Sequence, residues 1–408
     1  MKAARLVTLL LCPAAEPGYN DAVARIRAGD WEAGCQIAAD LFRVQPRFYA
    51  PHNLLGLCAA HRGDRAAAER AFRQSIALHP KFADSRNNLG IELLRRGDRT
   101  AALAEFNAAL TADSKNVTAL YNLGRIELDT GDHQRALPRL ETAAALAPED
   151  VPVRNALAEG LALAGYADYK LGNSQRAEQR LRRSLELNPG VEEVWMNMAE
   201  LLLYHQSFDA SIAFLTLGLG KFPESARLHL GLGVSQLAAG GRDEEGLQHI
   251  ETALQILPDF EPALAALCEA YHRNQQWKAL ERTAARWFRA HPQAYGALYY
   301  QALALQDNRV EAERLLAQSI AIQPRYAPSR LAMGKLQNEL EKPAEALTHF
   351  QAAIVADPED SAPHYQLVLT YRKLGQSEKS RQALAKFKNM KAKQQPWKAV
   401  FQLSKDTR

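Results

Sequence analysis

The stretch that decides the fold runs from Arg62 to Pro80 and reads RGDRAAAERAFRQSIALHP. From Arg96 the chain repeats its outline as RGDRTAALAEFNAAL, with the Gly-Asp pair and the phenylalanine 34 residues further on. The same interval separates four Gly-Asp pairs, which begin at Gly29, Gly63, Gly97 and Gly131. A fixed period of this length predicts an array of stacked structural repeats.

Each period predicts two antiparallel helices that pack against each other. In residues 49–82, Gly56 lies where a first helix crosses a second helix at Ala68, and Phe72 fills the space beside the crossing. The Gly-Asp pair lies between the helices, where glycine ends one helix and aspartate caps the next. Pro80 closes the second helix because proline cannot continue the hydrogen-bond ladder. A hairpin of this size cannot bury its apolar face alone, so neighbouring hairpins must stack on it.

Two segments of the repeat array resemble the repeat of a known family. Residues 87–110 read NNLGIELLRRGDRTAALAEFNAAL, and residues 121–148 read YNLGRIELDTGDHQRALPRLETAAALAP. Both resemble the tetratricopeptide repeat (TPR), whose pattern is a large residue, Leu-Gly, an aromatic residue or Leu, then Ala, Phe, Ala and Pro. The resemblance implies an all-α fold, a right-handed superhelical solenoid of antiparallel helix pairs over residues 15–393. The predicted repeats span 15–48, 49–82, 83–116, 117–150, 151–191, 192–225, 226–260, 261–294, 295–326, 327–360 and 361–393.

The two ends of the chain leave the repeat pattern. Residues 1–14 join two basic residues to a short apolar run and then to small residues, as a secretory signal peptide does. We therefore favour export to the periplasm or cell envelope, with a cytoplasmic chain and an apolar turn over the first repeat as the alternative. Residues 394–408 are predicted to form an amphipathic tail that caps the last repeat. A helix lying on a membrane surface is the alternative for this tail.

One repeat, 151–191, is seven residues longer than the period. Either Leu157-Ala158 or Ala164-Gly165 can fill its helix-crossing position. Seven residues make about two helical turns, so the sequence predicts a lengthened first helix that projects from one rim. Such a helix is either a contact for a partner or a second copy, or a tolerated insertion.

Composition and motifs argue against several classes of function. The net charge of +4 is nearly balanced and the repeats hold no basic block, so we expect no nucleic-acid partner. No apolar run approaches the ~18 residues of a spanning helix, so we expect no integral membrane segment. The histidines and glycines form no metal-binding, phosphate-binding or nucleophile motif, so we expect no catalytic, cofactor-binding or metal-binding residues and no enzyme activity. The two Arg-Gly-Asp triplets are explained by the turn of the repeat.

The cysteines are Cys12, Cys35, Cys58 and Cys268, and their spacing fits no zinc site. Cys35 and Cys58 fall on adjacent predicted helices and could approach each other. We expect buried free thiols instead, because small apolar residues surround these positions.

The family resemblance implies a partner protein or peptide in a concave groove. In the family, the second, fifth, sixth, ninth and twelfth residues of each repeat face that groove. The candidate groove residues are Asn53, Asn88, Tyr121, Asn122, Arg125 and Asn197, and Glu200 and Glu269 face the same groove. An asparagine amide can pair with any peptide backbone; alternatively, asparagine is simply common at this position in the family.

The predicted function is that of a non-catalytic scaffold for protein–protein interaction. An exported factor for envelope assembly or secretion, built on the same repeats, is the alternative. The Lys/Asn set with which some family members clamp a C-terminal carboxylate is absent, so we do not expect a receptor for chaperone tails.

Overall fold

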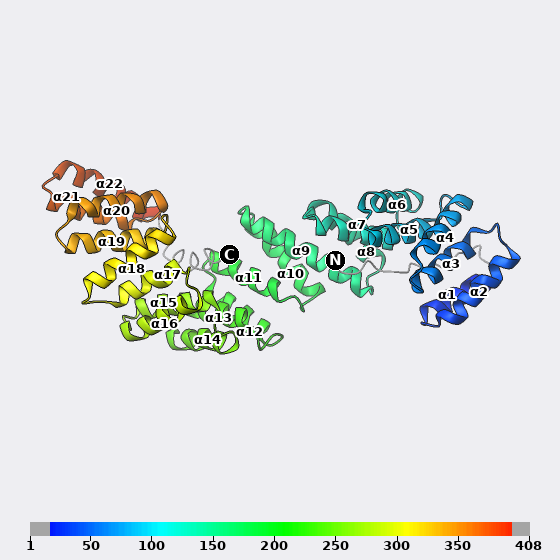
Figure 1. The fold of residues 1–408 in the computed structure, drawn as a ribbon, viewed down its shortest axis with the longest axis horizontal. Helices are drawn as coiled ribbons and strands as arrows, with labels where there is room; N and C mark the ends of the chain where they lie inside the picture. Colours follow the sequence, from blue (N-terminus) through cyan, green and yellow to red (C-terminus); the bar gives the residue numbers. More distant parts are fainter. Residues whose placement is uncertain (1–16, 394–408) are drawn as a thin grey trace. The chain divides into compact units, whose positions relative to one another are not determined.

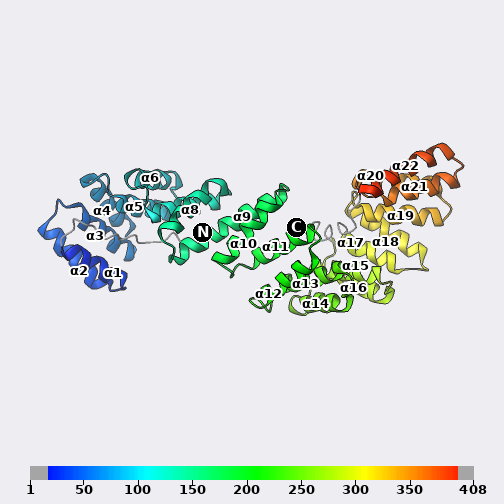
Figure 2. The same cartoon turned by 180° about the vertical axis from the view of Figure 1, so that it is seen from behind.

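The computed structural model describes residues 17–393, which form helices joined by short turns (Figures 1 and 2). No strand occurs within that range. The predicted signal peptide and the predicted C-terminal cap lie outside the described residues. Contacts divide the chain into two units: unit 1 is Met1–Val194 and unit 2 is Trp195–Arg408.

Unit 1 is built from helical hairpins, in which each helix packs against the next one along the chain. First helices of adjacent hairpins also touch, as α3 and α5 do. The helices are α1 (Pro17–Arg27), α2 (Trp31–Val44), α3 (Tyr49–His61), α4 (Arg65–Leu78), α5 (Ala83–Arg96), α6 (Arg99–Ala112), α7 (Val117–Asp129), α8 (His133–Leu146), α9 (Val151–Lys170) and α10 (Ser174–Leu187).

Unit 2 repeats the same arrangement, and the boundary between the units falls within its first helix, α11 (Glu192–Tyr204). The helices that follow are α12 (Phe208–Leu219), α13 (Ala226–Ala239), α14 (Asp243–Ile256), α15 (Glu261–Arg273), α16 (Trp277–Ala290), α17 (Tyr295–Ala304), α18 (Arg309–Ile322), α19 (Ala327–Glu339), α20 (Pro343–Ala356), α21 (Ala362–Lys373) and α22 (Ser377–Lys393). The described chain is therefore an all-α repeat solenoid.

The Gly-Asp pairs make the turn inside the hairpins as the sequence predicts. Gly63 and Gly97 have φ of 82° and 93°, a left-handed conformation that glycine adopts without steric cost. The next residue caps the second helix: the carboxylate of Asp98 accepts a hydrogen bond from the backbone N–H of Ala101 at 3.1 Å. This hydrogen bond holds the pKa of Asp98 below its usual value.

Glycines on the first helices allow the two helices of a hairpin to approach closely. A Cβ atom added to Gly56 would lie 2.4 Å from the ring of Phe72, and one added to Gly90 would lie 2.7 Å from the ring of Phe106. Both rings are fully buried. Small residues on one helix thus make room for large residues on the other, which interlock in the core.

Helix α9 is 20 residues long and contains the whole insertion. The Oγ of Ser184 donates to the carbonyl of Ala158 at 2.7 Å, as Ser75 Oγ donates to the carbonyl of Tyr49, the first residue of α3. Ala158 in α9 is therefore equivalent to Tyr49, the first residue of α3. Residues 151–157, which precede Ala158, are the two added turns. Gly165 takes the crossing position, since its missing Cβ would lie 3.0 Å from Leu181.

The two added turns do not project freely from the hairpin, which corrects the expectation of a projecting helix. Val153 and Leu157 are only 2% and 5% exposed. Val153 packs with Leu120 and Ala143 of the preceding hairpin. The gain from burying these apolar side chains explains why the turns lie against the preceding hairpin.

Candidate functional site

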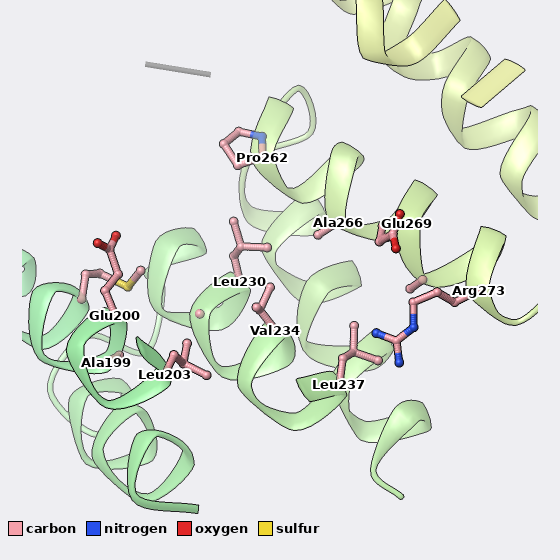
Figure 3. Close-up of a pocket in the computed structure, with 13 residues that line it drawn as sticks. Ala199, Glu200, Leu203, Leu230, Val234, Leu237, Pro262, Ala266, Glu269 and Arg273 are labelled. Atoms are coloured by element: carbon pink, nitrogen blue, oxygen red, sulfur yellow. The ribbon is translucent and has the colours of Figure 1, made fainter. Parts of the chain in front are cut away.

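An apolar groove in unit 2 is the strongest candidate for a binding site. Its lining comes from three successive first helices, α11, α13 and α15, and it encloses about 750 Å³, including the part open to solvent. Figure 3 shows Leu230 and Val234 of α13 between Glu200 on α11 and Glu269 and Arg273 on α15. The remaining lining residues are Met196, Ala199, Leu203, Gly231, Leu237, Pro262, Ala266 and Ala270.

The register of the repeats explains this lining. In the repeat that begins at Ala226, the fifth, sixth, ninth and twelfth residues are Leu230, Gly231, Val234 and Leu237, and all four line the groove. Glu200 and Glu269 are the ninth residues of the neighbouring repeats and line it as predicted. Leu230, Val234 and Leu237 were not among the predicted groove residues, although the same positional rule selects them, because the prediction was limited to polar, charged and aromatic side chains.

Charged groups lie around the apolar centre of the groove. Glu269 is half-buried and accepts a hydrogen bond from the hydroxyl of Tyr300 on α17 at 2.7 Å. Burial, with the Glu269 charge nearby, raises the pKa of the Tyr300 phenol well above its usual value, so it stays a donor. Tyr300 therefore fixes the Glu269 carboxylate, while the exposed guanidinium of Arg273 supplies a positive charge at the same wall. Such a site can bind an apolar side chain and orient it by charge.

The asparagines predicted for the groove of unit 1 are buried between repeats. The amide nitrogen Nδ2 of Asn88 donates to Oδ1 of Asn53 at 3.0 Å, and Asn122 donates to Asn87 in the same way at 3.1 Å. Asn53, Asn88 and Asn122 are at most 2% exposed. Each pair joins one first helix to the next, so these amides hold neighbouring hairpins together.

The other predicted groove residues lie in different surroundings. Arg125 on α7 forms an ion pair with Glu159 on α9 at 2.5 Å and a longer one with Asp129 at 3.5 Å. Tyr121 packs on the apolar cluster at the α7–α9 contact. Asn197 belongs to unit 2 and is 7% exposed. The structure thus brings Asn53 and Asn88 together; contact of these six residues with a peptide stays a prediction.

A disulfide joins the first two hairpins and corrects the expectation of free thiols. Cys35 on α2 and Cys58 on α3 are bonded at 2.02 Å, with their Cα atoms 5.8 Å apart. The packing of α2 on α3 brings the two Cα atoms into the range that a disulfide can bridge. Cys268 is a buried free thiol, and burial raises its pKa.

Comparison with known families agrees with the geometry. The family described as tetratricopeptide repeat matches residues 87–151, 162–225 and 196–259. The same hairpin unit, with its crossing glycine and its closing proline, continues on both sides of those residues. The chain is a tetratricopeptide repeat protein.

Several solved structures are similar to this TPR protein. Yeast Tom70 is 12% identical, with 95% of this chain and 93% of that chain covered and a TM-score of 0.47. The TPR protein YrrB, described as having an unusual peptide-binding site, is 24% identical, with 48% and 97% covered and a TM-score of 0.39. Pseudomonas aeruginosa pilF is 24% identical, with 52% and 92% covered and a TM-score of 0.37. No curated protein matches the chain in sequence.

Within residues 17–393, no helix combines the length and the apolarity needed to cross a bilayer. Nor do the described residues gather three or more His, Cys, Asp or Glu side chains in a way that could hold a metal ion.

A histidine pair between α13 and α14 is expected to make the stability of this TPR protein depend on pH. Nδ1 of His229 on α13 lies 3.1 Å from Nδ1 of His249 on α14, so only one of the two atoms can carry a proton. Burial, and then the charge of His229, lower the pKa of His249 from its ordinary 6.5. Between the lowered pKa and 6.5, the unfolded chain binds more protons than the folded chain, so the free energy of unfolding falls as the pH falls.

We therefore expect a lower unfolding temperature at pH 5.5 than at pH 7.5, measured by circular dichroism, and a smaller difference in His249→Gln. Part of the difference remains in the variant, because burial also lowers the pKa values of His349 and His364. An undiminished difference in His249→Gln would show that the pair does not contribute.

Proposed function

We propose that this protein is a non-catalytic interaction scaffold whose groove in unit 2 binds an apolar segment of a partner protein. The observation that carries the proposal is the apolar groove built by α11, α13 and α15. TPR arrays generally serve as scaffolds without catalytic activity. Helical-repeat grooves of this kind engage extended or helical segments of partner proteins.

The groove can contribute to both the affinity and the orientation of the bound segment. Burying one leucine-sized side chain on Leu230 and Val234 contributes roughly 1.5–3 kcal/mol. The charges of Glu200, Glu269 and Arg273 would set the direction and register of the bound segment, because complementary charges favour one orientation over its reverse.

The asparagines of unit 1 extend the proposal to a second stretch of the partner. Among residues 17–393, Nδ2 of Asn53 and Oδ1 of Asn88 find no hydrogen-bond partner, although Asn88 donates to Asn53 through their other amide atoms. Both atoms are buried, so a peptide backbone would supply their acceptor and donor only after α3 and α5 move apart. Each hydrogen bond formed would contribute about 1 kcal/mol. Tyr121 and Arg125 are the predicted neighbours of that contact.

Val234→Glu is the substitution that tests the groove. Val234 is half-buried at the groove centre, so a glutamate there would place an unpaired carboxylate against the bound apolar side chain. We expect the partner that co-purifies with the native chain from its source organism to bind at least about tenfold more weakly to the variant. Titration of the purified partner, followed by isothermal calorimetry, measures this change.

The matched control is Leu217→Glu, which makes a comparable apolar-to-acidic change at a residue of α12 that is 65% exposed and outside the groove. Leu217→Glu should bind the partner as the native chain does. Equal affinity of Val234→Glu and native chain would refute the groove as the binding site.

A second candidate function, export to the cell envelope as an assembly or secretion factor, is favoured by one observation. The Cys35–Cys58 disulfide is a bond that persists in oxidising compartments and is rare in the cytosol. Mass spectrometry of the native protein tests this candidate: a mature chain that begins near residue 16 supports export, and a chain that retains Met1 contradicts cleavage.

A further inference from the structure

The insertion in α9 opens a second cleft, which lies wholly within unit 1. The cleft encloses about 910 Å³, including the part open to solvent, and lies between the end of α8, the start of α9 and the end of α10. Arg154 and Leu157, from the two added turns, line it together with Leu161, Leu187 and Ala144. Without residues 151–157, Arg154 and Leu157 would be missing from its wall.

Arg154 is the residue that points to a ligand. Its side chain is half-buried; the described residues give its buried Nε atom no hydrogen-bond partner and its guanidinium no ion pair. An arginine cannot lose its charge to relieve this situation. A buried N–H donor of a charged group without an acceptor costs free energy, and a carboxylate that pairs with the partly exposed guanidinium would form a charge-assisted hydrogen bond.

The rest of the wall agrees with an acidic ligand that has an apolar neighbour. Arg183 lies in the same wall but is ion-paired with Glu186 at 2.8 Å, so Arg154 is the arginine of the lining that an acidic ligand would pair with; Glu141 is the one acidic residue in the lining. Leu161, Leu187 and Ala144 form an apolar surface next to the two arginines. We propose that this cleft binds a segment of a partner protein in which an aspartate or glutamate stands next to a leucine or phenylalanine.

A defined peptide probe tests the cleft separately from the groove of unit 2. The probe is a fluorescein-labelled pool of hexapeptides in which glutamate alternates with leucine or phenylalanine, and its matched pool carries glutamine in place of glutamate. Fluorescence anisotropy should show binding of the acidic pool, with about tenfold weaker binding of the glutamine pool and about tenfold weaker binding of the acidic pool to Arg154→Gln.

Three controls make the result specific. Arg176→Gln removes the same charge from an exposed position of α10 outside the cleft and should bind as the native chain does. Val234→Glu, in the groove of unit 2, should also bind normally, so failure of the groove and failure of the cleft are distinguishable. Circular dichroism melting checks that Arg154→Gln is folded.

The proposal is overturned by any of three results: no binding of the acidic pool, equal binding of both pools, or unchanged binding to Arg154→Gln. Analytical ultracentrifugation can give a fourth result that overturns the proposal. Self-association of the native chain that Arg154→Gln abolishes would assign the cleft to an interface between copies of this chain instead.

Discussion

Replacing Gly233 with alanine is expected to lower the free energy of unfolding by about 2 kcal/mol. Gly233 on α13 meets Gly246 on α14, where an added Cβ would lie 2.5 Å from the backbone oxygen of Gly246 and 2.7 Å from Cγ1 of Ile250. A backbone oxygen cannot rotate away as a side chain can, so α13 must move away from α14. Urea unfolding followed by circular dichroism measures the loss.

Gly160→Ala is the matched control for this prediction. The three atoms nearest to an alanine Cβ at this position of α9 would belong to leucine side chains, at 3.2 to 3.6 Å. These side chains can shift, and alanine favours a helix by roughly 1 kcal/mol over glycine, so the net change should stay within about 1 kcal/mol. If both variants unfold at the same urea concentration, close backbone approach does not explain the glycines at the crossings.

Removal of the Cys35–Cys58 disulfide is the second change with a large expected effect. The bond closes a loop of 23 residues in sequence separation, and a loop of about this size is expected to contribute about 3 kcal/mol. Because repeats contact only their neighbours, the loss should fall mainly on α1 to α4. Hydrogen exchange of the Cys35→Ser/Cys58→Ser double variant should therefore rise in these helices and stay unchanged in unit 2.

Adding reductant is the control for the hydrogen-exchange experiment on the disulfide. It should speed exchange in the native chain to the level of the double variant and leave the double variant unchanged. Titration of the free thiols in the unfolded, unreduced chain gives an independent check of the disulfide. Reaction of Cys35 and Cys58 as free thiols would contradict the bond.

The fold could be predicted from the sequence because residues close together in each repeat determine its turn and its helix crossing. Gly97 needs a left-handed conformation and Asp98 supplies a cap, so the turn is specified by two adjacent residues. The crossing of Gly90 with Phe106 depends only on the positions of these residues along their two helices, and the same positions recur in successive repeats. The lengthened first helix followed from the same count.

Features that depend on contacts between helices, within a hairpin or between hairpins, could not be predicted in this way. The pairing of Cys35 with Cys58 depends on a Cα separation that sequence spacing does not give. Both Ala158 and Gly165 suited the crossing in α9, and only the contact of Ser184 with Ala158 decides which turns are added. The Asn53–Asn88 bond was missed because a groove position was equated with exposure to solvent.

Site-specific photo-crosslinking tests the groove of unit 2 most directly. A benzoylphenylalanine placed at Val234 should crosslink to one short apolar segment of the partner protein, identified by mass spectrometry, because Val234 lies at the groove centre. The same group placed at Leu217, which is exposed outside the groove, should give no such product. Crosslinking from Leu217 but not from Val234 would contradict the central claim that this groove holds the partner.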